Sequence, residues 1–123
     1  MKAHYRVVVI GGGISAAAQS AYPNRPVQLI ISYGAGSTGD VSMRLLMEQL
    51  SAKLGQPFVV INKPGAGGIA AAQAAVATPP DGYTLFLTGN SSAISVALFK
   101  SLPYNILTDF APVSTVANFE AAR

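Results

Sequence analysis

The sequence has 123 residues, which is enough for one domain with its own core and not comfortably enough for two. Half of the residues are hydrophobic and 11% are charged, a balance that argues against a disordered chain. The net charge of +3 comes without any cluster of lysine and arginine, so the composition argues against a nucleic-acid partner.

The side chains needed for most enzyme chemistry are scarce. The sequence contains no cysteine, and its single histidine, His4, stands at the very start. This removes disulfides, thiolate nucleophiles and thiolate metal sites, and no nucleophile is paired with a base. No apolar run reaches the roughly 18 residues that a membrane-spanning helix needs. We therefore expect a binding protein without catalytic residues, cofactor or metal, and not an enzyme.

The opening segment fits an export signal. Lys2 and Arg6 form a basic start, Val7 to Ala18 supply a mostly apolar run, and Ala16 with Ala18 or Ala18 with Ser20 supply the small residues of a cleavage site. This order is typical of a secretory leader, so residues 1–20 are predicted to be a signal peptide that is removed on export.

The same segment has a second interpretation. The stretch RVVVIGGGIS resembles the first strand and loop of flavin-dependent amine oxidoreductases, with Gly11, Gly13 and Ala16 in G-x-G-x-x-G/A spacing. A dinucleotide site also needs an acidic residue after the next strand, and the first acidic residue of the chain is Asp40. This context favours the leader. A third possibility is that the opening residues were joined to an unrelated domain.

After Pro26, short apolar runs alternate with helical patterns. The runs are typical of strands buried in a parallel sheet, and right-handed crossovers would join them. The predicted class is thus α/β, with a parallel βαβαβ sheet. We expect strands over Val27–Ser32, Phe58–Ile61, Tyr83–Thr88 and Val113–Ala117, and helices over Asp40–Leu54, Ile69–Thr78 and Ala93–Lys100.

The first predicted helix has the clearest pattern. Its expected buried face carries apolar residues at helical spacing, namely Met43, Leu46, Met47, Leu50 and Leu54. Ser37 and Asp40 have the spacing of a capping box at its start, and Gly55 offers a left-handed stop at its end.

Three glycine- and hydroxyl-rich loops follow the first three strands, at Tyr33–Asp40, Asn62–Gly68 and Thr88–Ser92. In a parallel sheet all three lie at the carboxyl edge, beside helix N-termini that attract anions. Ordinary strand-to-helix turns use the same residue types, so this alternative stays open. A triphosphate loop is excluded because Asp40 stands where the lysine is required.

Several longer motifs resemble one family. INKPGAGG, PPDGYTLFLTG and LPYNILTDFAPV, in this order between Tyr22 and Ala117, are similar to the Bug-type receptors. These are the extracytoplasmic solute-binding proteins of tripartite tricarboxylate transporters.

The resemblance implies a periplasmic-binding-protein-like fold of two α/β lobes, a cleaved export signal and a periplasmic location. Residues 21–123 are then expected to be a truncated first lobe, with the second lobe missing. The implied ligand is a small carboxylated solute, and the implied partners are the membrane components of the transporter.

The resemblance also implies a binding site in the first and third loops, with the solute's carboxylate held by backbone and hydroxyl groups. The implied residues are Tyr33, Gly36, Ser37, Thr38, Asp40, Thr88, Asn90, Ser91 and Ser92. Asp40 would in addition anchor the first helix. The first loop departs from the family pattern at Ser37 and Gly39. The alternative functions are a flavin- or nicotinamide-binding fragment of an oxidoreductase and an inactive α/β domain.

Overall fold

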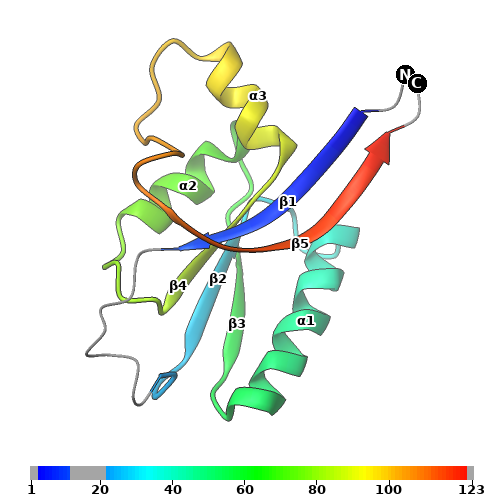
Figure 1. Ribbon diagram of the computed structural model, residues 1–123, viewed down its shortest axis with the longest axis vertical. Helices are drawn as coiled ribbons and strands as arrows, with labels where there is room; N and C mark the ends of the chain where they lie inside the picture. Colours follow the sequence, from blue (N-terminus) through cyan, green and yellow to red (C-terminus); the bar gives the residue numbers. More distant parts are fainter. Residues whose placement is uncertain (1–2, 12–21, 122–123) are drawn as a thin grey trace.

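The computed structural model describes residues 3–11 and 22–121, which form a mixed five-stranded sheet with helices on both faces (Figure 1). The strands lie in the order β3-β2-β4-β1-β5. The elements are β1 (Ala3–Gly11), β2 (Val27–Ile31), α1 (Thr38–Leu54), β3 (Phe58–Asn62), the 3₁₀ turn η2 (Ala66–Gly68), α2 (Ile69–Val76), β4 (Thr84–Thr88), α3 (Asn90–Leu98) and β5 (Ala111–Ala121).

The parallel part of the sheet agrees with the sequence-based prediction. β2 pairs in parallel with both β3 and β4. The strands expected at Val27–Ser32, Phe58–Ile61 and Tyr83–Thr88 are confirmed to within one residue at each end. The α/β class with a parallel sheet is therefore confirmed for these strands.

The remaining two strands differ from a simple parallel series. β1 pairs antiparallel with both β4 and β5, so it separates β5 from β4. The strand expected at Val113–Ala117 lies inside the longer β5. It does not extend the ladder of β4 directly, because the backbone groups of β4 on that side already pair with β1.

The antiparallel pairing of β1 bears on the oxidoreductase alternative. A dinucleotide-binding unit needs its first strand to run parallel to its neighbour, which β1 does not do. Gly11 ends β1, whereas Gly13 and Ala16 lie outside the described residues. Removal of residues 1–20 as a leader stays a prediction.

Alternating side chains of β2 build a core on each face of the sheet. Leu29 and Ile31 pack with Met43 and Met47 of α1, whereas Ile30 points to the opposite face, beside the alanines of α2. Leu29, Ile30 and Ile31 are each at most 3% exposed. The sheet is thus covered on both sides, as the apolar runs of the sequence indicate.

The ends of α1 follow the sequence signals. Ser37 caps the start of the helix through its side chain, and Gly55 ends the helix in the left-handed region at φ 74°. Met43 and Met47 are buried, as predicted. The prediction for Leu54 is wrong, since its side chain is 47% exposed at the end of the helix.

Candidate functional site

The carboxyl ends of three parallel strands meet at one edge of the sheet. β2 ends at Ile31, β3 at Asn62 and β4 at Thr88, and α1, α2 and α3 begin just after them. Figure 1 shows the three helices starting near this edge. The three loops predicted from the sequence therefore share it, which is where open α/β sheets bind ligands.

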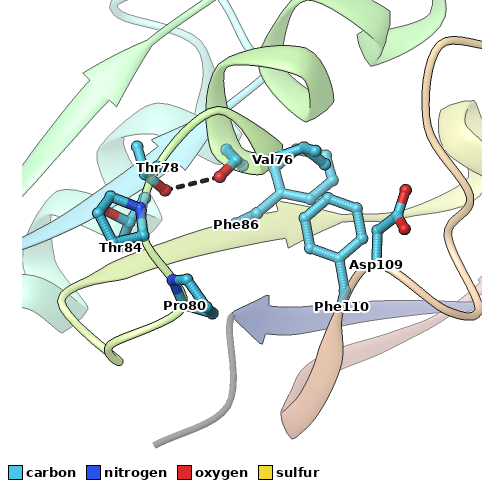
Figure 2. A pocket seen from close by; sticks show the side chains of 9 residues that line it. Val76, Thr78, Pro80, Thr84, Phe86, Asp109 and Phe110 are labelled. Atoms are coloured by element: carbon cyan, nitrogen blue, oxygen red, sulfur yellow. Dashed lines mark hydrogen bonds between the residues drawn. The ribbon is translucent and has the colours of Figure 1, made fainter.

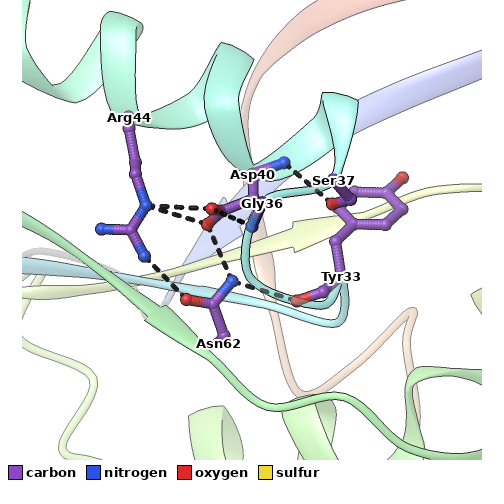
Figure 3. Close-up of polar contacts among 6 residues, drawn as sticks. All are labelled: Tyr33, Gly36, Ser37, Asp40, Arg44 and Asn62. Atoms are coloured by element: carbon purple, nitrogen blue, oxygen red, sulfur yellow. Dashed lines mark hydrogen bonds and ion pairs between the residues drawn. The ribbon is translucent and has the colours of Figure 1, made fainter.

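The first loop is held by the carboxylate of Asp40 (Figure 3). Arg44 Nε donates to both carboxylate oxygens at 3.1 and 3.0 Å. Gly36 N–H donates to Oδ2 at 2.9 Å, and Asn62 Nδ2 donates to Oδ1 at 2.8 Å. The carboxylate is thus surrounded by donors from the loop, from α1 and from the end of β3.

Asn62 connects the second loop to the first. Besides its bond to Asp40, its Nδ2 donates to the carbonyl of Tyr33 at 3.0 Å, and its Oδ1 accepts from Arg44 at 2.8 Å. The side chain therefore satisfies both its donor and its acceptor groups within the cluster.

These bonds determine the charge state of Asp40. The residue is 3% exposed, and its hydrogen bonds with Arg44, Asn62 and Gly36 lower the pKa of its carboxyl to about 2. Donors that bond to the ionised form favour that form. Asp40 is consequently a fixed negative charge at the start of α1. Its hydrogen bonds connect the start of α1 to the first loop and to the end of β3.

The capping arrangement differs in detail from a capping box. Asp40 N–H donates to Ser37 Oγ at 3.3 Å, as expected. The returning carboxylate, however, accepts from Gly36 and not from the N–H of Ser37, which donates to the carbonyl of Gly34 at 3.2 Å. The difference arises because the loop turns at Gly36, with φ 84°.

Tyr33 lies across the start of α1. A Cβ added at Gly39 would lie 2.7 Å from Cδ2 of the Tyr33 ring, so the ring rests on the glycine. Tyr33 and Thr38 also border a mainly apolar hollow of about 430 Å³ that reaches Leu87 and Val116. Gly39, which departs from the family pattern, therefore leaves the space that the Tyr33 ring occupies.

The second and third loops are joined through Ser95. Its hydroxyl lies 2.9 Å from the carbonyl oxygen of Gly67 and 2.9 Å from that of Ser91. Gly67 and Gly68 have φ values of 63° and 79°, a region that favours glycine. The glycine pair in the INKPGAGG motif thus brings the start of α2 against α3.

The residues predicted in the third loop occupy the end of β4 and the first turn of α3. Thr88 is the last residue of β4. Asn90 accepts from the N–H of Ser91 at 3.0 Å, and Ser92 is 4% exposed. The sequence-based site therefore falls into two groups, one at α1 and one at α3.

Three residues of this edge were not predicted from the sequence as parts of the site, namely Arg44, Asn62 and Ser95. Arg44 stands four residues after Asp40, a spacing that pairs opposite charges on a helix. Asn62 is the first polar residue after the strand Phe58–Ile61. Both signals were available in the sequence, whereas the contact between Ser95 and Gly67 spans 28 positions and depends on the fold.

Another hollow, of about 180 Å³, lies where β4 begins, between the end of α2 and Phe110 (Figure 2). The rings of Phe86 and Phe110 stack at 5.4 Å along its wall. Its polar side chains include Thr78, which donates to the carbonyl of Ala75, and Asp109, which accepts from the N–H of Asn105. The pocket lies away from the three loops, and these two polar groups already have partners.

Within residues 3–11 and 22–121, no group of three acidic, histidine or cysteine side chains is placed to hold a metal ion. None of the helices in the described part of the chain is both long and apolar enough to cross a membrane.

The chain is similar to curated proteins of two Bordetella species. It is 43% identical over 110 residues to a UPF0065 protein of Bordetella bronchiseptica and 39% identical over 115 residues to protein BugT of Bordetella pertussis. These alignments cover 89% and 91% of this chain but only 33% and 35% of the relatives. The chain thus spans about a third of the length of these relatives.

Solved structures and a family model agree with these similarities. MatC from Rhodopseudomonas palustris, solved with bound malate, matches with a TM-score of 0.65 at 34% identity, over 72% of this chain and 30% of MatC. A structure described as a periplasmic transporter matches with a TM-score of 0.64 at 39% identity, over 69% of this chain and 29% of its own. The family model described as tripartite tricarboxylate transporter family receptor matches residues 42–122. The chain belongs to the receptor family of the tripartite tricarboxylate transporters.

Proposed function

We propose that this chain forms the first α/β lobe of a periplasmic receptor that captures a small carboxylated solute and delivers it to the membrane components of a tripartite transporter. The family is one of solute-binding receptors and not of enzymes. Related structures are described with malate and with adipate, both of which are dicarboxylates. The second wall of the cleft would come from a second lobe outside this chain.

One structural observation supports this function for the lobe: three helices begin at the edge where the loops gather. Helix N-termini carry partial positive charge and backbone donors, so they hold an anion without a cationic side chain. The residues proposed to line the site are Tyr33, Gly36, Ser37, Thr38, Asp40, Thr88, Asn90, Ser91 and Ser92. Asp40 contributes by holding the first loop in shape.

Thermal unfolding tests the capture of an acid. The 123-residue chain is heated with malate, adipate or citrate, and with the neutral diamide of adipic acid at the same concentration as a control. At about ten times the Kd, a ligand that binds the folded chain raises Tm by about 5 °C. The acids should raise Tm and the diamide should not. No shift with any acid would count against the proposed function.

A mass measurement tests the proposed export. The chain is expressed in a Gram-negative host, and the periplasmic protein is isolated and weighed. Loss of about the first 18 to 20 residues, where small side chains fit a cleavage site, supports a cleaved leader. A product that keeps Met1 and stays in the cytoplasm contradicts the proposed location.

A further inference from the structure

β1 connects β5 to the rest of the sheet. It pairs antiparallel with β4 over Val8–Gly11 and with β5 over its whole length, Ala3–Gly11. In the strand order β1 is the neighbour of β5, and the described part of the chain has no strand on the other side of β5. Figure 1 shows β1 and β5 extending together beyond β4. The position of β5 therefore depends on backbone pairing with one strand.

The side chains of β5 add little to this attachment. Among the residues of β5 whose side chains are described, 111–117, none is buried. Val113 is 63% exposed, and Val116 is the residue that packs, partly buried, against the core beneath α1. β2, by contrast, pairs with β3 and β4 on its two sides and contributes buried side chains to both faces of the sheet. The parallel strands thus have contacts of their own that do not involve β1.

The ladder between β1 and β5 contains features that weaken it. Its register shifts between Val7 and Val8 and again between Val9 and Ile10. Each such irregularity interrupts the regular hydrogen bonding of a sheet. Pro112 of β5 stands opposite Ile10 and has no N–H to donate. These interruptions make β1 easier to remove than a strand with an unbroken ladder.

β1 lies wholly inside residues 1–20, the segment proposed to be removed on export. Neighbouring strands lie about 4.8 Å apart, so loss of β1 would leave a gap one strand wide between β4 and β5. The backbone groups of both strands that now pair with β1 would face this gap without partners. Unpaired strand edges of this kind bind another extended segment.

We propose that β1 is a temporary strand. While the leader is attached, residues 3–11 cover the inner edges of β4 and β5, and removal of the leader opens a groove that binds one extended segment antiparallel to β4. The occupant that fits this groove is the leader segment itself, residues 3–11, which rebinds as a separate peptide. This inference rests on the proposed export of the chain. It gives the leader a second function, because a covered edge does not pair with other chains before export.

Hydrogen exchange of the full, uncleaved chain tests the attachment of β5. The amides of β1 and of Ser114–Ala117 should exchange together, and faster than those of β2 and β3. Val9→Pro removes a backbone donor from β1, so Ser114–Ala117 should exchange at least about tenfold faster while β2 keeps its protection. Val9→Ala keeps the N–H and is the matched control. Equal protection of β5 and β2 in the unsubstituted chain, or loss of protection in β2 on Val9→Pro, would overturn the proposal.

The processed chain tests the groove. The protein isolated from the periplasm after removal of the leader is measured alone and with a synthetic peptide of residues 1–12. Ser114–Ala117 should exchange without protection in the processed chain and regain protection with the peptide, whereas the same peptide with Val9→Pro should not restore it. Protection of β5 without the peptide, or no recovery with it, would overturn the groove. If the isolated protein keeps Met1, the proposed export fails, and exchange of the uncleaved chain still decides whether β1 holds β5.

Discussion

Asn62 Nδ2 lies 2.8 Å from Asp40 Oδ1, and this bond joins the end of β3 to the first turn of α1. The two residues are 22 positions apart in the sequence. Because the same amide also donates to the carbonyl of Tyr33, one side chain holds both ends of the loop between β2 and α1. The shape of the first loop therefore depends on a residue of the second.

Replacing Asn62 with alanine should loosen the first loop and destabilise the fold. The substitution leaves the largely buried Asp40 carboxylate and the carbonyl of Tyr33 each without one donor, at a cost of about 1–3 kcal/mol. Urea unfolding at pH 7 measures the change. The exposed residue Gln73 provides a control, since Gln73→Ala removes an amide from the surface of α2 and should change stability by less than about 0.5 kcal/mol. Equal stability of the two variants would contradict the role of Asn62.

The carboxylate of Asp40 predicts an acid-dependent loss of stability. Its pKa is about 2 in the folded chain and 3.8 in its ordinary state, so the unfolded chain binds the proton more readily. The stabilisation is present above about pH 4 and is lost as the pH falls toward 2. Urea midpoints between pH 2 and 5 should fall for the unsubstituted chain. Asp40→Asn should be less stable at pH 7 and should flatten this part of the profile. An unchanged slope would contradict the assignment of the acid-dependent loss of stability to Asp40.

Gly67 should not tolerate a side chain. A Cβ there would collide with Ser95 Oγ, and the φ of 63° strains any other residue. Gly67→Ala should lower the free energy of unfolding by about 1–3 kcal/mol. Gly34→Ala is the matched control, because its Cβ would meet nothing within 4 Å and its φ is not positive. Combining Gly67→Ala with Ser95→Ala should recover only part of the loss, since the backbone strain remains.

Replacing Tyr104 with phenylalanine should stabilise the fold. The Tyr104 hydroxyl is buried without a hydrogen-bond partner among the described residues, and burial raises the pKa of the phenol. Tyr104→Phe should therefore raise the free energy of unfolding by about 1 kcal/mol. Tyr22 gives the opposite case, because its hydroxyl donates to the carbonyl of Gly82 at 2.7 Å, and Tyr22→Phe should cost about 1 kcal/mol. Thermal unfolding of both variants checks the contrast, and a loss of stability in Tyr104→Phe would show that the hydroxyl has a partner.

The sequence by itself determined the parallel core of the fold, the caps of α1 and the family. These features depend on local patterns: the apolar run of β2, the spacing of Ser37 and Asp40, and the left-handed glycine at position 55. Each can be predicted because residues close in the chain produce it. The pairing of β1 could not be predicted, since a strand's partners depend on which backbone edges remain free after the other strands have paired.

Only the tertiary structure decided which loop residues act together. The sequence placed three loops at one edge, but it could not show that the Asp40 carboxylate pairs with both Arg44 and Asn62, or that Ser95 joins the second loop to the third. Side chains 22 to 28 positions apart meet because parallel strands bring their carboxyl ends to one edge. The electrostatics at the start of α1 depend on that meeting, because the Asn62 amide reaches the Asp40 carboxylate only in the folded sheet.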